Sequence, residues 1–285
     1  MLLLRREFLN RAALATGAGT LFAASASNGS ALLYDLRADR ILVADGPREA
    51  TEWLAAPGST VKPLTLWALL RMGRVKPDES FPCPRYLRLA GLQMNCSHPR
   101  LPFPVTVTEA IAYSCNCATA HFAARFRGDE LARFYETFGL ESQTHLLVRS
   151  ERTGAVATGL RGDELKLQAL GERGVRVTAL ELAAAYRRLS GLANDPQFQP
   201  ILEGLEGAVR VGTGQAAQVK GITVAGKTGS VQTDSGLRAA WFAGFAPSRK
   251  PEVLVTVLTQ GRSGAEAAAP IAGKLLRQYF SKSDS

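Results

Sequence analysis

Apolar residues alternate with polar ones in short runs at both ends of the chain, a pattern typical of strands. Near the beginning, residues 31–34 and 41–44 form two apolar runs around a polar stretch and predict a β-hairpin. Toward the end, three runs separated by turn residues predict an antiparallel meander over 223–233, 238–246 and 253–259. A helix with one apolar face is expected to follow, over 264–280.

The middle of the chain shows helical periodicity instead. Five segments carry it: 59–72, 106–112, 116–125, 129–138 and 178–190. Because the strands at the two ends can join into one sheet, we expect an α+β fold with a five-stranded antiparallel sheet flanked by helices. We predict a single domain over 27–285. Its sheet lobe comprises 30–58 and 220–285, and its mainly helical lobe comprises 59–219.

The first 26 residues predict an export signal. Arg5 and Arg6 begin the twin-arginine pattern R-R-x-F-L, and the apolar stretch that follows is too short for a comfortable membrane span. Ala24-Ser25-Ala26 resembles a signal-peptidase cleavage site. We therefore expect an exported protein, periplasmic or otherwise extracytoplasmic. Membrane association is expected only if this segment is not cleaved.

Composition fits a soluble globular protein, because 46% of the 285 residues are hydrophobic and 21% are charged. It excludes a disordered tail protein and a multi-span membrane protein. The net charge of +9 fits a polyanionic partner such as nucleic acid, anionic lipid or an acidic wall polymer. Export and the lack of a basic, aromatic stripe argue against nucleic acid.

Cysteines of an exported protein are able to pair. Cys83 and Cys96 lie in a proline-rich loop and could bridge, whereas Cys115 and Cys117 are too close in sequence to bond to each other. A zinc site would need Cys96, His98 and His121 to converge, and these spacings match no common zinc pattern. The sequence therefore predicts neither a metal nor a cofactor, and it leaves a Cys83–Cys96 bond open.

Three short patterns carry candidate chemistry: Ser59-Thr60-Val61-Lys62, Ser114-Cys115-Asn116 and Lys227-Thr228-Gly229. Alone, each also fits a purely structural role, as a helix cap, a loop cap or a basic strand. In the first pattern, Lys62 lies one helical turn after Ser59, so its amine can serve as the base that a serine nucleophile needs. Burial or nearby positive charge would lower the pKa of that amine.

The other two patterns supply polar groups that could face a common cleft. A tight inter-helix loop can present Ser114 for proton relay and Asn116 for a substrate carbonyl. On a strand, Lys227 and Gly229 share one face, and this cation with nearby hydroxyls would suit a substrate carboxylate. The Ser230 N–H, with that of Ser59, could form an oxyanion hole.

Taken together, these patterns resemble the transpeptidase domain of penicillin-binding proteins, within the serine β-lactamase and D-Ala-D-Ala peptidase superfamily. Pro57–Pro63 reads PGSTVKP and resembles the family's PGSTFKP, and Ala225–Gln232 resembles AGKTGTAQ. Ala240–Pro247 resembles the AWFxGFAP strand, and Gly171–Leu189 resembles the helix that precedes the third motif. The likeness covers nearly all of residues 30–280.

The resemblance implies a role for each matched position. Ser59 would attack a D-Ala-D-Ala stem peptide of peptidoglycan, Lys62 would be the base and Ser114 would relay the proton. Substrate would be held by the remaining positions: Asn116, Lys227, Thr228, Gly229 and Ser230. The acyl-enzyme would pass to an amine, as in a D,D-transpeptidase, or to water, as in a D,D-carboxypeptidase. β-Lactams would acylate Ser59, and other cell-wall synthesis proteins would be the expected partners.

Two alternatives stay open. A β-lactamase needs a group that activates the deacylating water, yet no E-x-x-x-N occurs between the second and third motifs, and Asn116 departs from the S-x-V of class D-like enzymes. A non-catalytic penicillin-binding sensor or wall-binding scaffold would be expected to lose Ser59 or Lys62, and both are present.

Overall fold

The computed structural model describes residues 28–283 except 149 and 233–235, and the predicted export signal over 1–26 lies outside this range. Its strands are β1 (Gly29–Asp35), β2 (Arg40–Asp45), β3 (Arg88–Leu89), β4 (Leu92–Gln93), β5 (Ala155–Val156), β6 (Val175–Arg176), β7 (Ala225–Gln232), β8 (Arg238–Ala246) and β9 (Val253–Gln260). Its α-helices are α1 (Pro47–Glu52), α2 (Lys62–Arg71), α3 (Val107–Ala112), α4 (Asn116–Ala123), α5 (Glu130–Thr137), α6 (Gly162–Leu170), α7 (Ala179–Ser190), α8 (Gln199–Arg210) and α9 (Ala269–Ser283).

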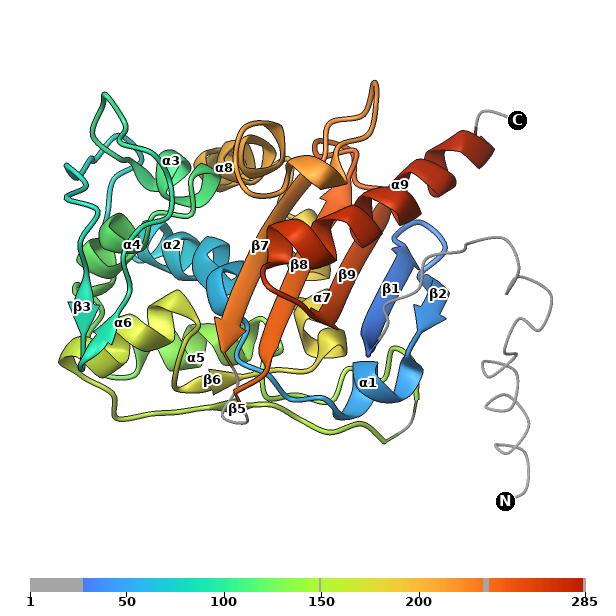
Figure 1. Ribbon diagram of the computed structural model, residues 1–285, viewed down its shortest axis with the longest axis horizontal. Coiled ribbons are helices and arrows are strands. Elements are labelled where there is room, and N and C mark those ends of the chain that lie inside the picture. The colour runs from blue at the N-terminus through green and yellow to red at the C-terminus, as the bar shows by residue number, and fades with distance from the viewer. Residues whose placement is uncertain (1–27, 149, 233–235, 284–285) are drawn as a thin grey trace, which may run out of the picture.

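Five strands form one antiparallel sheet in the order β2-β1-β9-β8-β7 (Figure 1). The N-terminal hairpin therefore joins the C-terminal meander, as predicted. Side chains of β8 alternate between two cores: Trp241 and Phe245 face one side, whereas Phe242 faces the other. Helix α9 covers the second side and α7 packs on the first, so both faces of the sheet are buried.

Helix α2 lies at the centre of the helical part and is buried on every side. All residues from Lys62 to Leu69 are buried, so only its last turn reaches the surface. A helix that is apolar all round belongs inside a protein, and its neighbours are α4, α5, α6 and α8. Pro63 sits in the first turn, where its missing N–H removes no helical hydrogen bond.

Three helices, α1, α6 and α8, were not predicted from the sequence. In α6 the buried residues gather in the second half of the helix rather than along one face, so its sequence has little amphipathic pattern. Helix α1 is only six residues long, too short to show one. The predicted first helix over 59–72 is divided in the structure, since its first turn, Gly58–Val61, is a 3₁₀ turn. The predicted last helix begins with a wider π turn over Gly264–Ala268.

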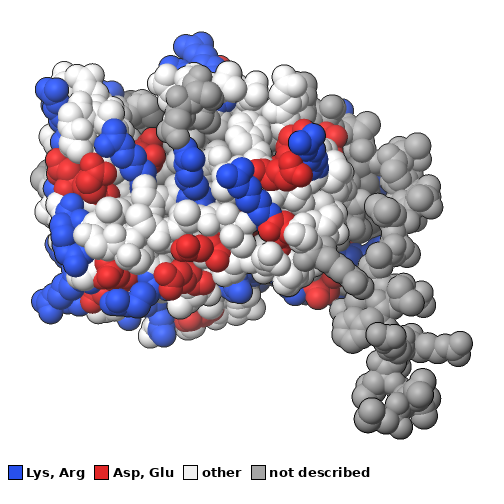
Figure 2. Space-filling model, turned by 90° about the horizontal axis from the view of Figure 1, so that it is seen from below, with Lys and Arg blue, Asp and Glu red and all other residues white. Residues whose placement is uncertain are grey.

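Within the described residues, no helix combines the length and the apolar character needed to cross a membrane. On the face shown in Figure 2, basic and acidic side chains are intermingled over the surface. The positive net charge therefore does not gather into a single basic patch on that face.

Glu181 anchors α7 from inside the protein. Its fully buried carboxylate accepts backbone N–H bonds from Thr178 at 2.8 Å, Glu141 at 2.9 Å, Ser142 at 3.1 Å and Gly154 at 2.8 Å. Glu181 thereby forms a capping box with Thr178, and the same carboxylate also holds the chain at residues 141, 142 and 154.

We expect Glu181→Ala to lower the free energy of unfolding by at least about 3 kcal/mol, because four backbone donors lose their acceptor. Urea denaturation would measure the loss. Glu203→Ala, on the exposed side of α8, is the matched control and should change stability by less than about 0.5 kcal/mol. Equal stability of the two variants would contradict this account.

Candidate active site

Ser59 lies in a 3₁₀ turn that is held from several directions. The Gly58 N–H donates to the Gly171 carbonyl at 2.9 Å, and the Tyr186 hydroxyl of α7 donates to the Thr60 carbonyl at 2.8 Å. Trp241 of β8 donates from Nε1 to the Ala56 carbonyl at 3.0 Å. These bonds tie the turn to both the sheet and the helices, so the half-buried Ser59 occupies a fixed position.

Two glycines allow this close packing. Gly58 has φ 54°, a left-handed conformation that favours glycine. Gly229 of β7 lies so close to the turn that a Cβ atom there would stand 2.5 Å from the Pro57 carbonyl oxygen. The third motif therefore runs directly past the first, and a Cβ on Gly58 would lie 3.2 Å from the Ser230 nitrogen.

Lys62 connects the first motif to the second. Its fully buried Nζ atom donates to the Ser114 carbonyl at 2.8 Å, to Ser114 Oγ at 3.3 Å and to Asn116 Oδ1. Asn116 is oriented in turn by donating to the Met94 carbonyl at 3.0 Å. Ser114 has φ 54°, which is uncommon outside glycine and marks a backbone held in place by its surroundings.

Lys227 of β7 is also fully buried. Burial lowers the pKa of this lysine well below its usual range, and the positive charge of Lys62 lowers it further. For Lys62 itself, burial lowers the pKa to about 8. A lysine with that pKa is partly neutral near pH 7, as a base for a serine must be.

The two hydroxyl groups of the third motif have different surroundings. The Thr228 hydroxyl is hydrogen-bonded to the Thr213 hydroxyl, a neighbour that the sequence analysis missed. Ser230 is exposed, and its Oγ accepts the Gly264 N–H at 2.8 Å. Ser230 is therefore the hydroxyl of this strand that remains open to a ligand.

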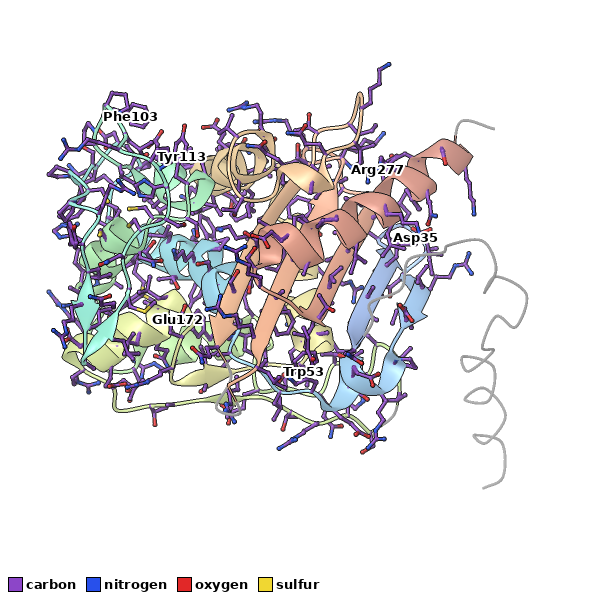
Figure 3. All side chains as sticks on the ribbon, viewed as in Figure 1. Asp35, Trp53, Phe103, Tyr113, Glu172 and Arg277 are labelled. Atoms are coloured by element: carbon purple, nitrogen blue, oxygen red, sulfur yellow. The ribbon has the colours of Figure 1, made fainter. Side chains whose placement is uncertain are left out.

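Glu172 is a second residue that the sequence analysis missed. It follows Gly171, whose carbonyl holds the turn before Ser59, and it lines a cavity of about 450 Å³ with Val231 and Gln232 of β7. Figure 3 shows Glu172 beside the end of that strand. Burial raises the pKa of Glu172 to about 7, and the nearby Lys62 charge opposes the rise. No E-x-x-x-N pattern marks this residue, because it is brought to the site by the Gly58–Gly171 contact.

All four cysteines, which lie within the described residues, have free thiols. Cys83, Cys96 and Cys115 approach one another and His98 beside the second motif. His121, which the zinc hypothesis required, instead stacks on Phe81 with ring centroids 4.1 Å apart. The side chains that meet are therefore those of Cys83, Cys96, His98 and Cys115, rather than the Cys96, His98 and His121 that the zinc hypothesis required.

The fold is the α+β arrangement of solved penicillin-binding transpeptidase domains. The family model described as penicillin binding protein transpeptidase domain matches residues 29–277, and the chain belongs to this family. The transpeptidase domain of Burkholderia pseudomallei penicillin-binding protein 3 superposes with a TM-score of 0.81 at 22% identity, covering 91% of this chain and 89% of that one. Pseudomonas aeruginosa PBP2, solved in complex with WCK 5153, gives a TM-score of 0.77 at 20% identity, covering 88% and 73%.

Curated relatives carry transpeptidase names. Peptidoglycan D,D-transpeptidase PbpA of Mycolicibacterium smegmatis is 28% identical over 262 residues, covering 75% of this chain and 53% of that protein. Probable peptidoglycan D,D-transpeptidase PenA of Neisseria flavescens is 25% identical over 260 residues, covering 80% and 63%. The chain therefore spans between half and two thirds of the length of these relatives.

The buried amine predicts an unusual pH dependence of stability. A lysine whose pKa is lowered to about 8 in the folded state holds fewer protons there than in the unfolded chain between pH 8 and 10.5. The contribution of Lys62 to stability should therefore rise with pH across that interval, by about 3 kcal/mol. Lys62→Met should remove this part of the rise and leave the part that the buried Lys227 contributes, as measured by urea denaturation at several pH values. Lys220→Met, at an exposed position, should retain the whole rise, and identical pH profiles for all three proteins would refute the assignment.

Proposed function

We propose that the protein is a penicillin-binding serine acyltransferase, a D,D-transpeptidase that acts on the D-Ala-D-Ala end of peptidoglycan stem peptides. The observation that carries this proposal is the hydrogen bonding of buried Lys62 to Ser114 and Asn116, one turn from Ser59. Membership of the transpeptidase family and the names of the relatives support it. The acceptor amine is that of another stem peptide.

In this mechanism, neutral Lys62 accepts the hydroxyl proton of Ser59 while Ser59 Oγ attacks the penultimate D-Ala carbonyl carbon. The backbone N–H groups of Ser59 and Ser230 stabilise the oxyanion. Ser114 relays the proton to the leaving amine, and the terminal D-Ala departs as the acyl–serine ester forms. The acceptor amine then attacks the ester carbonyl carbon and loses a proton to Lys62. The bond between the acyl carbon and Ser59 Oγ breaks, and Ser59 Oγ takes this proton from Lys62 as the cross-link forms.

Substrate binding divides between the second and third motifs. Asn116 holds a backbone amide of the stem peptide. Lys227 binds the terminal carboxylate, whose negative charge favours the protonated form of this buried amine, and the exposed Ser230 hydroxyl donates to the same carboxylate. Thr228 and Gly229 lie between these two residues on β7 and complete the binding strand. A β-lactam presents the same carboxylate and acyl group, so it acylates Ser59. We place this activity outside the cytoplasm, because peptidoglycan lies there and the predicted export signal would direct the protein there.

Mass spectrometry of the intact protein after incubation with a penicillin tests the proposal. We expect an adduct of the drug's mass on the wild-type chain and at least a roughly 10³-fold slower acylation of Ser59→Ala. Ser281→Ala, on an exposed part of α9, should acylate like the wild type. An adduct that forms equally on Ser59→Ala, or none on the wild type, would overturn the proposal.

Transfer of the acyl group to water is a second candidate activity, and Glu172 favours it. A carboxyl group with a pKa of about 7 beside the serine turn is suited to accept a proton from water as the water oxygen attacks the acyl carbon. The ester then breaks and Ser59 is restored. This chemistry would make the protein a D,D-carboxypeptidase, or a β-lactamase when the acyl group comes from the drug.

For this candidate, we expect Glu172→Gln to slow loss of the penicillin adduct by about 10²-fold or more while acylation changes less. Deacylation of the wild type should rise with pH through about 7, as Glu172 loses its proton. Time-resolved mass spectra at pH 5.5 to 8.5 would measure both rates. Glu136→Gln, at an exposed position of α5, is the control. Equal adduct lifetimes in Glu172→Gln and the control would exclude Glu172 as the base.

A further inference from the structure

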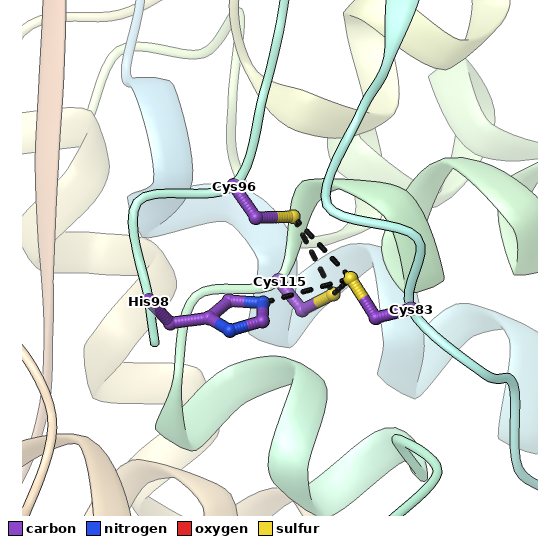
Figure 4. Close-up of side chains that lie close together, drawn as sticks. All are labelled: Cys83, Cys96, His98 and Cys115. Atoms are coloured by element: carbon purple, nitrogen blue, oxygen red, sulfur yellow. Dashed lines mark hydrogen bonds between the residues drawn. The ribbon is translucent and has the colours of Figure 1, made fainter. Parts of the chain in front are cut away.

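Four metal-ligating side chains meet beside the second motif, although they come from three separate stretches of chain (Figure 4). Cys83 and Cys96 lie on the two arms of the β3–β4 hairpin, where the Cys96 N–H donates to the Arg85 carbonyl at 2.9 Å. His98 follows two residues later, and Cys115 begins α4. The donor atoms of all four residues lie within 4.8 Å of one another.

Their separations match those of a tetrahedral site. Cys83 Sγ is 3.7 Å from Cys96 Sγ, 3.4 Å from Cys115 Sγ and 3.7 Å from an imidazole nitrogen, His98 Nε2. Cys96 Sγ and Cys115 Sγ are also 3.7 Å apart. Four sulfur atoms at a zinc–sulfur distance of about 2.3 Å would be about 3.8 Å from one another. A disulfide, by contrast, needs sulfur atoms about 2.05 Å apart.

The histidine is held in the tautomer that a metal requires. His98 is buried, and its Nδ1 atom lies 2.7 Å from the Pro99 carbonyl oxygen. A carbonyl only accepts, so Nδ1 carries the proton and the lone pair of Nε2 faces the sulfur atoms. A backbone carbonyl on the other ring nitrogen is the usual support of a metal-binding histidine.

The sulfur atoms receive backbone support of the kind that suits thiolates. The Ala118 N–H donates to Cys115 Sγ and the Cys117 N–H donates to Cys96 Sγ, both at 3.4 Å. Both donors belong to the first turn of α4, where the helix dipole favours negative charge. Two ligands on different segments are thus stabilised by one helix N-terminus.

We propose that Cys83, Cys96, His98 and Cys115 bind one Zn²⁺ ion in a closed structural site. Three thiolates and one imidazole form a soft, tetrahedral donor set that suits zinc. Because the protein fills all four positions, the ion has no open place for substrate. Binding of zinc does not depend on the acyl-transfer chemistry proposed above, and only its effect on the reaction rests on that proposal.

Such an ion would position the second motif. Cys115 stands between Ser114 and Asn116, whose oxygen atoms accept from Lys62. The Asn116 amide also donates to Met94, two residues before Cys96. The ion would therefore fix the hairpin against the loop that holds Lys62, and its loss should loosen that loop without removing any group that touches substrate.

Elemental analysis of the full chain, purified from zinc-supplemented medium without metal-affinity resin, tests the site. We expect about one zinc per chain in the wild type and in Cys117→Ser, and only background zinc in Cys83→Ser and His98→Ala. Cys117 is the matched control, because its Sγ is 3.5 Å from Cys96 Sγ but it is not one of the four ligands. Replacement by Co²⁺ should give the intense visible absorption of a tetrahedral site in the wild type and the control.

A chelator added to the wild type keeps the test independent of variant folding. Removing zinc should lower the melting temperature and slow penicillin acylation, and added zinc should restore both. No bound zinc in the wild type, or equal zinc in Cys83→Ser and Cys117→Ser, would overturn the site. So would alkylation under denaturing conditions that finds a disulfide rather than four free thiols. Zinc at full occupancy in a chain that no penicillin acylates would instead refute the proposed function and leave the site standing.

Discussion

The buried amine of Lys62 is the constraint on which the arrangement of the site depends. An ammonium group inside a protein is costly unless it is hydrogen-bonded, and here three oxygen atoms of the second motif accept from it. If the Ser114–Asn116 loop moved, the amine would be left buried without partners. The same burial lowers the pKa of Lys62 to about 8. One interaction thus holds the site together, and the amine that makes it is the one that we propose as the base.

That interaction needs a rigid frame, and the fold provides it from two sides. Helix α2 is enclosed by other helices, so the amine cannot swing out to solvent. The turn that carries Ser59 is held by α7 through Tyr186, by β8 through Trp241 and by the loop of Gly171. These hydrogen bonds are made by backbone groups of the turn, so they leave the hydroxyl of Ser59, the proposed nucleophile, free of those contacts. Folding therefore already fixes the position of Ser59, and a reaction there would not have to remove that conformational freedom.

The hairpin that carries Cys83 and Cys96 is the third segment that contacts the site. It has only two short strands, and its hydrogen bonds to the second motif are made by sulfur atoms and by Asn116. A segment of this kind has little apolar core of its own, which is the circumstance in which proteins use metals or disulfides for support. A zinc ion there would complete the frame on the third side of the Lys62 amine.

Much of this protein could be predicted from local pattern. Alternating apolar runs predicted the strands of the five-stranded sheet, and the order of the three motifs, with their flanking residues, predicted the family. Periodicity failed for α6, because its exposed residues lie in its first half and most of its buried residues in its second half, so no polar face runs along the helix. It also placed a regular helix over the 3₁₀ turn at Ser59, which tertiary hydrogen bonds shape.

By itself, then, the sequence determined the five strands of the main sheet, most helices and the residue types of the site, because these depend on neighbours a few positions apart. Only the tertiary structure decided that Glu172 stands beside the serine turn, that Thr228 pairs with Thr213, and that Cys83 and Cys115 meet His98. Each of these depends on segments far apart in the chain. Spacing along a chain fixes distances within one helix or strand, whereas a meeting of distant segments is fixed by how the whole core packs.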